Sequence, residues 1–243
     1  MVEKSLSEIR GNYQTVLANI ANAARSVGRQ PEEVKLVVVT KGHSLETVHA
    51  VVTAGARFLG ENYVEEALPK IVAFTGEPLE WHMIGHVQSR KAQPVAEHFA
   101  WVQSVDSLKL ARRLDRFAGQ SERVIPILLE CNVSQEESKF GWPAWREDRW
   151  PDFAQVLAPL LELPNLEVRG LMTMPPYDPD PENLRIYFEK LARLSAFLAD
   201  RFPQSSWGEL SMGMSGDYEV AVQSGATIVR VGTAIVGPRP STT

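Results

Sequence analysis

The sequence predicts a single (β/α)8 barrel of the TIM type. The chain has 243 residues, close to the roughly 250 that such a barrel uses. Short apolar runs alternate along it with amphipathic stretches, and buried parallel strands have this character. An open doubly wound sheet is the second choice, because no G-x-G-x-x-G pattern follows the first run. No stretch resembles an interdomain linker, so we expect one domain over residues 1–243.

The candidate strands are apolar runs rich in Val, Ile, Leu and Met. Several are apolar on both faces, as strands covered on both sides are. In chain order they are Leu36–Thr40, Arg57–Gly60, Trp81–Ile84, Trp101–Val105, Val124–Asn132, Val168–Met174, Gly208–Met212 and Thr227–Val231. Two irregular stretches, 134–150 and 175–181, follow strands. We therefore expect them on the face of the barrel that carries active sites.

The segments between the strands carry helical periodicity. Gly55 and Gly225 stand where a helix gives way to a strand, the position just after a helix that favours glycine. Apolar residues recur at steps of three and four in segments 6–20, 45–52, 108–117 and 184–198.

Composition excludes several classes of protein. Apolar residues make up 44% and charged residues 23%, near the globular average, which excludes a disordered or fibrous chain. No apolar run reaches the ~18–20 residues that span a bilayer, and residues 1–10 have no apolar signal-peptide core. The single cysteine, Cys131, excludes a disulfide framework and favours a reducing cytoplasm. The net charge of −5 argues against nucleic acid as a partner.

Lys41 directly follows the apolar run Val37–Thr40. In a barrel this position places its amine at the mouth. A lysine there is either a surface residue that begins a loop or a desolvated amine with a lowered pKa that forms a Schiff base. The position alone leaves both interpretations open.

Two segments near the C-terminus suggest an anion site. Ser215 precedes Gly216-Asp217 and is expected to cap a short helix. Gly232-Thr233 follows the last candidate strand, where glycine lets backbone N–H groups approach an anion. Barrels bind phosphate after strands seven and eight. The alternative is that Ser215 only caps a helix and Gly232 only turns the chain.

Arg230 alternates with Val229 and Val231 in the last candidate strand. The alternation predicts that its side chain points into the barrel, where a charge needs a partner or a ligand. A buried ion pair with Glu61 or Glu209 is the alternative.

Weaker candidates lie elsewhere. Asn62 closes the second candidate strand and offers its amide to a ligand. His82 and His86 are spaced as a metal pair on a helix would be, but a strand end with a glycine separates them, so we expect no metal site. The three tryptophans of segment 142–150 are expected to pack locally rather than to form a recognition surface.

Six ordered motifs together closely resemble the pyridoxal phosphate homeostasis proteins. They are Lys41 after VVVT, GENY at 60–63, WHMIG at 81–85 with Gln88-Ser89 and Lys91, RGLM at 169–172, LSMGMS at 210–215 and RVGTAI at 230–235. The resemblance covers residues 6–239 and implies a barrel like the N-terminal domain of alanine racemase. The chain departs from the family pattern at His86, Val87 and Arg90, which affects contacts at the barrel rim.

The resemblance also implies a cofactor and its ligands. Pyridoxal 5′-phosphate (PLP) would be held as a Schiff base on Lys41, with Arg230 facing the pyridine nitrogen. Asn62 would lie near the ring hydroxyl and His82 close by. The residues implied for the phosphate are Ser215, Gly232 and Thr233.

This reading favours a cofactor carrier over a fast enzyme. A cation at the pyridine nitrogen disfavours ring protonation, which leaves a poorer electron sink. A racemase also needs a second base, which a further domain supplies in alanine racemase, and we expect no such domain because the chain ends at Thr243. We therefore expect a monomeric, cytoplasmic protein that stores, buffers or delivers PLP to PLP-dependent apo-enzymes.

Two alternatives remain from the sequence. One is a small PLP-dependent amino-acid racemase, with Tyr63 or His82 as the second base. The other is a sugar-phosphate isomerase on the same barrel, for which Glu209 is the nearest catalytic candidate.

Overall fold

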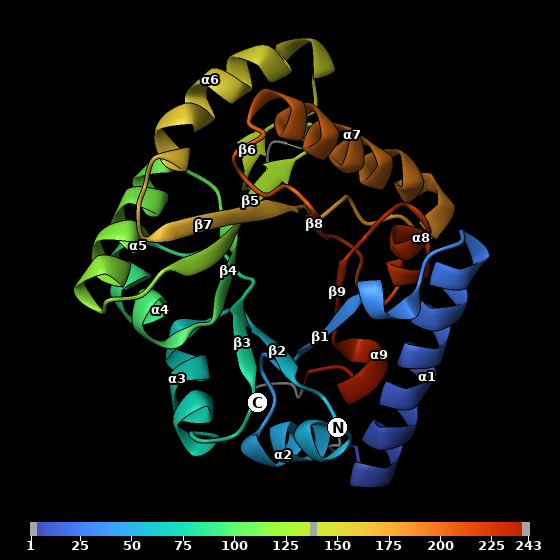
Figure 1. Ribbon diagram of the computed structural model, residues 1–243. Helices are drawn as coiled ribbons and strands as arrows, with labels where there is room; N and C mark the ends of the chain where they lie inside the picture. The colour runs from blue at the N-terminus through green and yellow to red at the C-terminus, as the bar shows by residue number, and fades with distance from the viewer. Residues whose placement is uncertain (1–3, 137–139, 240–243) are drawn as a thin grey trace.

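Parallel strands close into a barrel in the computed structural model, which describes residues 4–136 and 140–239. The order around the ring is β4-β3-β2-β1-β9-β8-β7-β5, and β4 pairs with β5 to complete it (Figure 1). The short β6 pairs with β5 outside the ring. The strands are β1 Lys35–Val39, β2 Phe58–Glu61, β3 Glu80–Met83, β4 Trp101–Val105, β5 Ile125–Asn132, β6 Trp142–Pro143, β7 Leu166–Met172, β8 Glu209–Ser211 and β9 Ile228–Val231. The predicted (β/α)8 barrel is confirmed.

Helices surround the ring of strands (Figure 1). The N-terminal helix α1 lies beside the C-terminal segment, where Asn12 Nδ2 donates to the carbonyl oxygen of Ile235 at 2.9 Å. The α-helices are α1 Leu6–Ser26, α2 Leu45–Thr53, α3 Val64–Ala73, α4 Ala92–His98, α5 Leu108–Gln120, α6 Trp150–Leu161, α7 Arg185–Arg201, α8 Tyr218–Gln223 and α9 Thr233–Val236. Short 3₁₀ turns lie at Pro31–Glu33, Ser89–Lys91, Glu147–Arg149 and Pro181–Leu184.

The strands are apolar on both faces because each face has its own packing partner. Outward-facing residues join the helices in one large core. Inward-facing residues form a smaller cluster inside the barrel, made of Val37, Trp101, Leu128, Met172 and Ile228. Arg230 lies two residues after Ile228 on β9 and therefore shares its inward direction.

Several element boundaries differ from the sequence prediction. Thr40, Ile84 and Met174 lie beyond their strands, because the strands end before the chain turns into the barrel mouth. Periodicity did not reveal α3, α4 and α6, each of which contains proline. Part of the predicted irregular stretch 134–150 falls at 137–139, outside the described residues, and the remainder contains the unexpected strand β6.

Predictions for the glycines after helices and for the tryptophans agree with the structure. Gly55 and Gly225 follow α2 and α8 with φ of 112° and 100°, as predicted for the residue after a helix. Trp142 and Trp150 are buried, and their indole N–H groups donate to the carbonyl oxygens of Val105 and Ala144. Both tryptophans therefore pack locally, as expected.

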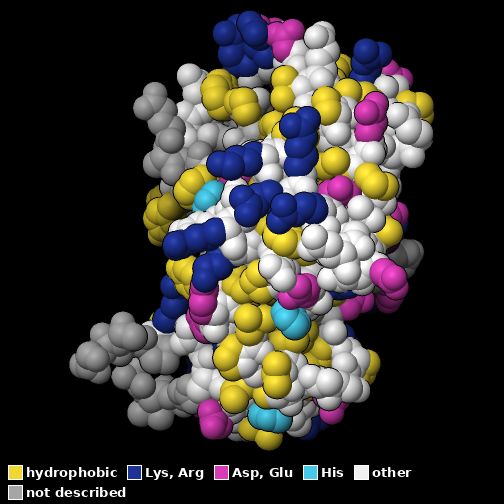
Figure 2. Space-filling model, turned by 90° about the vertical axis from the view of Figure 1, so that its left-hand side faces the viewer, with side chains coloured by type: hydrophobic (Ala, Val, Ile, Leu, Met, Phe, Trp, Pro, Cys, Tyr) yellow, Lys and Arg dark blue, Asp and Glu magenta, His cyan; other side chains and the backbone are white. Residues whose placement is uncertain are grey.

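The acidic net charge conceals a basic band on one side of the molecule. Figure 2 shows Lys and Arg side chains crossing the middle of the face that carries α3, α4 and α5. The exposed basic residues of α5 include Lys109, Arg112, Arg113 and Arg116. Among residues 4–136 and 140–239, no helix is long and apolar enough to cross a membrane.

Gly170 permits the close approach of β7 and β8. It has φ of 151°, and an added Cβ would lie 1.9 Å from the carbonyl oxygen of Glu209. The β5–β7 register shifts opposite it, between Ile127 and Leu128. Since the clashing atom belongs to the backbone of the neighbouring strand, the strand itself would have to move to relieve the contact.

We predict that Gly170→Ala lowers the free energy of unfolding by about 3 kcal/mol, the upper part of the usual overpacking range. Gly11→Ala is the matched control, because Gly11 lies exposed in α1 with no atom within 4 Å of the added Cβ. That substitution should stabilise the protein by about 1 kcal/mol through helix propensity. Urea unfolding of both variants checks the pair, and equal stabilities would contradict the account of Gly170.

Candidate functional site

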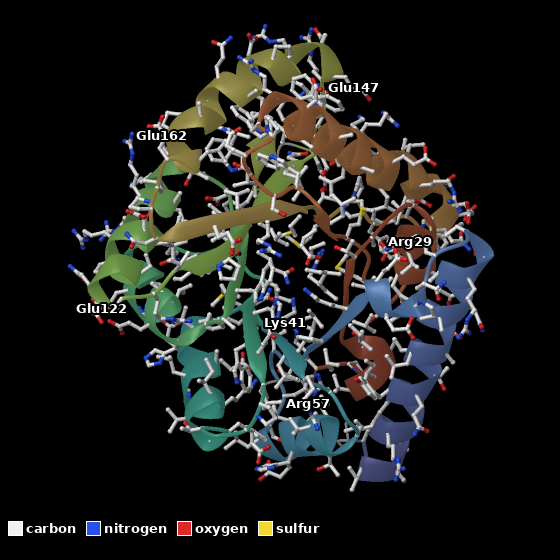
Figure 3. All side chains as sticks on the ribbon, in the orientation of Figure 1. Arg29, Lys41, Arg57, Glu122, Glu147 and Glu162 are labelled. Carbon is white, nitrogen blue, oxygen red and sulfur yellow. The ribbon has the colours of Figure 1, made fainter. Side chains whose placement is uncertain are left out.

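A cavity of about 330 Å³ opens at the carboxyl end of the barrel, where β1, β2 and β9 are neighbours. Figure 3 places Lys41 near the centre of the ring of strands. The pairing order explains the gathering, since β1 lies between β2 and β9. Six of the seven predicted cofactor residues line this cavity: Lys41, Asn62, Ser215, Arg230, Gly232 and Thr233.

A buried ion pair holds the backbone just before Lys41. Lys70 Nζ donates to Glu61 Oε1 and to the carbonyl oxygen of Thr40, both at 2.9 Å. The Thr40 hydroxyl donates to the same Glu61 oxygen at 2.6 Å. The side chains of Lys70 and Glu61 are 5% and 0% exposed. The end of β1 is thereby tied to β2 and α3, which fixes where the Lys41 side chain begins.

The Lys41 amine lies in a strongly cationic setting. Burial lowers its pKa to about 8, and the charges of Arg239 and Arg230 lower it further than the opposing carboxylates of Glu61 and Glu66 raise it. The ordinary lysine pKa is about 10.4. A much larger fraction of Lys41 is therefore the unprotonated, nucleophilic amine near neutral pH.

Arg230 is buried on β9 and is hydrogen-bonded inside the barrel. Its Nη1 donates to the Ser211 hydroxyl at 2.6 Å and its Nη2 to the carbonyl oxygen of Thr173 at 2.9 Å. Burial lowers its pKa to about 10, an effect that Asp217 and Glu130 oppose. The guanidinium therefore stays charged at neutral pH.

The predicted alternative for Arg230, an ion pair with Glu61 or Glu209, is wrong. Glu61 pairs with Lys70, as described above. Glu209 pairs with Lys35 at 3.0 Å, towards the other end of β1. Each of these acidic residues is paired with a lysine, so neither forms an ion pair with Arg230. The charge of Arg230 therefore remains available to a ligand in the cavity.

A line of hydrogen bonds connects Arg230 to His82 across the barrel interior. The Ser211 hydroxyl donates to Gln103 Oε1 at 2.6 Å. Gln103 Nε2 lies 2.8 Å from His82 Nδ1, and as a donor it assigns the imidazole proton to Nε2. Burial lowers the pKa of His82 to about 3, so the ring is neutral, and it stacks on Trp101 with centroids 5.7 Å apart.

His82 is thus absent from the described residues that line the Lys41 cavity. Hydrogen bonds through Gln103 and Ser211 connect it to Arg230 of the cavity. His86, the other histidine singled out from the sequence, lies at the barrel rim, where its Nδ1 is 2.9 Å from Asp106 Oδ2. Residues 4–136 and 140–239 contain no cluster of three or more His, Cys, Asp or Glu side chains that could hold a metal ion.

Ser215 has a different local role from the one predicted. Helix α8 begins at Tyr218 with Asp217 in the cap position, so Ser215 does not cap it. A turn intervenes, in which the Asp217 amide donates to the carbonyl oxygen of Met214. The Ser215 hydroxyl instead accepts from the amide of Ala234 at 3.2 Å, which ties the two loops of the proposed anion site together.

Close packing shapes the rest of the cavity. A Cβ on Gly232 would lie 3.2 Å from the carbonyl oxygen of Val39, and one on Gly85 would lie 2.6 Å from the Asn62 Cα. Asn62 Oδ1 is buried without a hydrogen-bond partner. Such orphaned acceptors are rare in folded proteins, so its position favours a ligand that donates to it.

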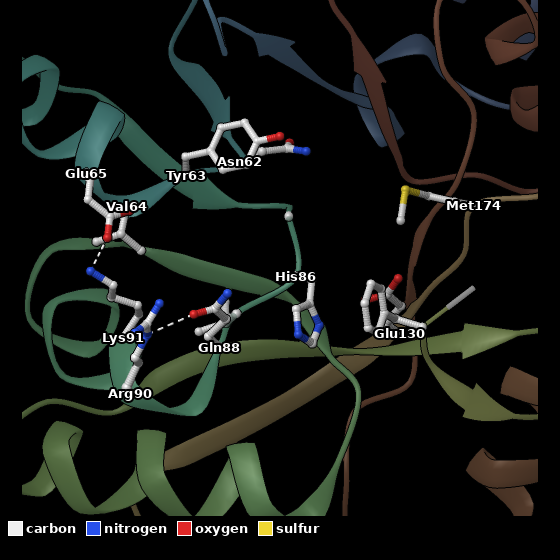
Figure 4. A pocket seen from close by; sticks show the side chains of 13 residues that line it. Asn62, Tyr63, Val64, Glu65, His86, Gln88, Arg90, Lys91, Glu130 and Met174 are labelled. Carbon is white, nitrogen blue, oxygen red and sulfur yellow. Dashed lines mark hydrogen bonds and ion pairs between the residues drawn. The ribbon is translucent and has the colours of Figure 1, made fainter. Parts of the chain in front are cut away.

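A second, larger cavity adjoins the first. This mouth pocket of about 530 Å³ shares Asn62 and Met174 with the Lys41 cavity (Figure 4). Glu130, from the end of β5, lines it and is 3% exposed. Sequence reasoning missed Glu130, although one acidic residue in the apolar run 125–131 was a usable signal. It also missed Gln103, which has no local sequence signature, and the role of Ser211, although Ser211 lies in the motif LSMGMS.

Comparison with known proteins identifies the family of this chain. The profile of the family "Alanine racemase, N-terminal domain" matches residues 12–240. A pyridoxal phosphate homeostasis protein of Vibrio cholerae is 40% identical over 239 residues, covering 96% of this chain and 98% of that protein. PipY of Synechococcus elongatus, solved with PLP bound, is 37% identical with a TM-score of 0.78, covering 90% of this chain and 100% of PipY.

A more distant structure shows the fold alone. An alanine racemase of Clostridium difficile is 16% identical with a TM-score of 0.69, and the match covers 97% of this chain and 58% of that one. The near-full-length matches at high identity decide the family. The chain belongs to the pyridoxal phosphate homeostasis protein family and has the fold of the alanine racemase N-terminal domain.

Proposed function

We propose that this protein binds PLP in the Lys41 cavity and serves in PLP homeostasis by storing, buffering or delivering the cofactor. The observation that carries the proposal is one cavity that gathers a depressed-pKa lysine, a buried arginine and a hydroxyl- and glycine-rich rim. The names of the relatives and the PLP bound to PipY support it.

The residues of the cavity suit the chemical groups of PLP. The cofactor carries a phosphate dianion, and the cavity is lined by three cationic side chains, those of Lys41, Arg230 and Arg239. Ser215, Gly232 and Thr233 offer hydroxyl and backbone donors at the rim for the phosphate. The orphaned Oδ1 of Asn62 offers an acceptor to the ring hydroxyl.

Lys41 would hold the cofactor covalently as a Schiff base. Its unprotonated amine is the group that would condense with the aldehyde of bound PLP, with loss of one water. When bound, PLP supplies an electron-withdrawing ring and an aldehyde that amines exchange. The burial and neighbouring cations that lower the pKa of Lys41 to about 8 favour the neutral amine that this linkage requires.

Arg230 would face the pyridine nitrogen. Two of its donors are taken by Ser211 and Thr173, so the guanidinium is fixed in place. It stays charged and has no acceptor to offer, which disfavours a proton on the ring nitrogen. The ring is then a weak electron sink, which suits holding the cofactor more than driving carbanion chemistry.

The proposal also covers the cellular role of the protein. PLP-dependent apo-enzymes would be the recipients of the cofactor, and the protein would act as a cytoplasmic monomer.

A small PLP-dependent racemase is the alternative, favoured by the shared alanine racemase fold. His82 is an unsuitable second base, because it lies outside the cavity lining with its pKa lowered to about 3. Deuterium exchange at Cα over a panel of amino acids separates the two, since rapid exchange with turnover would favour the racemase.

We predict that Lys41→Ala abolishes the Schiff-base absorbance of PLP-loaded protein and its borohydride-stable mass increase. Lys109→Ala is the matched control, because Lys109 is an exposed lysine on α5. It should keep the absorbance, and the reduced adduct should map to the peptide that contains Lys41. An unchanged spectrum in Lys41→Ala, or an adduct on another lysine, would show that the assignment of Lys41 is wrong.

A second prediction concerns pH. The rate at which cofactor-free protein captures PLP should rise with pH and level off with a midpoint near 8, the lowered pKa of Lys41. Arg239→Gln removes a cation that opposes protonation of Lys41, so the midpoint should move to higher pH. Stopped-flow absorbance measures both. A midpoint near 10 in the unmodified protein, or a downward shift in the variant, would contradict this electrostatic account.

A further inference from the structure

Glu130 is a buried acid that the proposed cofactor site does not use. It lies at the carboxyl end of β5, is 3% exposed, and lines the mouth pocket (Figure 4). Its Oε2 atom has no hydrogen-bond partner. A buried carboxylate oxygen without a partner is destabilising, and in a pocket it marks a candidate functional group.

The charges around Glu130 are opposed in sign. Burial, and then the nearby carboxylate of Asp106, raise the pKa of Glu130 to about 7, while Arg230 acts in the other direction. Asp106 follows β4 and lies against His86 of the barrel rim. Arg230 approaches Glu130 from β9. Glu130 therefore changes protonation state near neutral pH, where an efficient general base should do so.

The mouth pocket gives access to the cofactor cavity. The two cavities share Asn62 and Met174, and Figure 4 shows Glu130 and Met174 on the same side of the pocket. A group that enters from solvent through the mouth pocket thus meets Glu130 next to the Lys41 cavity. The pocket volume of about 530 Å³ accommodates an amino acid or the end of a lysine side chain.

We propose that the mouth pocket receives the primary amine that takes the cofactor from Lys41, and that Glu130 binds its ammonium group and accepts the proton. This rests on the proposed function. Amines are protonated at neutral pH and have no free electron pair for attack. An orphaned carboxylate beside the cofactor cavity supplies both a counter-charge and a base.

The atoms and protons balance in the proposed transfer of the cofactor from Lys41 to the incoming amine. The ammonium group loses one proton to the Glu130 carboxylate and becomes a neutral amine. Its nitrogen forms the new C=N bond to the cofactor carbon, while the C=N bond to Lys41 breaks. The two remaining amine protons pass to the departing nitrogen, so that Lys41 leaves as a neutral amine. No oxidant, reductant or further reactant is needed.

Glu130→Gln tests the proposal. PLP-loaded protein is mixed with glycine or with Nα-acetyl-lysine, which represent a free amino acid and a protein lysine, and the loss of the Lys41 Schiff base is followed by absorbance. Wild-type rates should rise through a midpoint near pH 7, and Glu130→Gln should be slower by about 100-fold. A response to only one of the two amines identifies the source of the acceptor.

Two controls make the result specific. Glu167→Gln changes an exposed carboxyl near the opposite end of the barrel and should leave both rates unchanged. Hydroxylamine is already neutral at pH 7, so it should react equally fast with wild type and Glu130→Gln. Equal rates for wild type and Glu130→Gln with glycine and acetyl-lysine, or an equal slowing with hydroxylamine, would overturn the role of Glu130.

A second readout needs no bound cofactor. Calorimetric titration of cofactor-free protein with ethylammonium should show binding at pH 8 that weakens below pH 7 and falls about tenfold or more in Glu130→Gln. Equal affinity in the two proteins would overturn the proposal. A failure of the proposed function looks different, because wild-type protein would then form no borohydride-reducible Schiff base at all.

Discussion

The pairing of β1 with β9 is the contact on which the site depends. It joins the first strand of the barrel to the last, with Val37 directly opposite Arg230. The chain segments after these two strands are far apart in sequence, yet they must meet at the barrel mouth. Lys41 thereby reaches the same cavity as Arg230, Gly232 and Thr233. With a different register between β1 and β9, the Lys41 amine and the proposed phosphate-binding residues would not line the same cavity.

Arg230 places a charged guanidinium in the interior of the barrel. A buried guanidinium needs several acceptors, and the barrel supplies them through Ser211 and Thr173. The polar line continues through Gln103 to a neutral His82. It runs among the apolar side chains of the inner cluster, since His82 stacks on Trp101. This arrangement fixes a charge next to the cavity.

The sequence was sufficient for the barrel, because eight apolar runs and their spacing reflect strands buried on two faces. It was also sufficient for the cavity residues that follow strands, such as Lys41 and Gly232. It was insufficient for pairs made across the barrel. That Gln103 joins Ser211 to His82, for example, depends on which strands become neighbours and in what register. Ser215 was misassigned for a related reason, since its partner amide lies on Ala234 in another loop.

The two proposals assign different tasks to two adjoining cavities. The inner one is lined by Lys41, Arg230 and Arg239, which suit an anionic cofactor. The mouth pocket holds the buried carboxyl of Glu130 together with Glu65, Arg90 and Lys91. A crystal structure of the protein with PLP would show directly whether Lys41 holds the cofactor. We expect continuous electron density from Lys41 Nζ to the cofactor, with the phosphate against Ser215, Gly232 and Thr233. A phosphate bound in the mouth pocket, with Lys41 unmodified, would contradict this expectation.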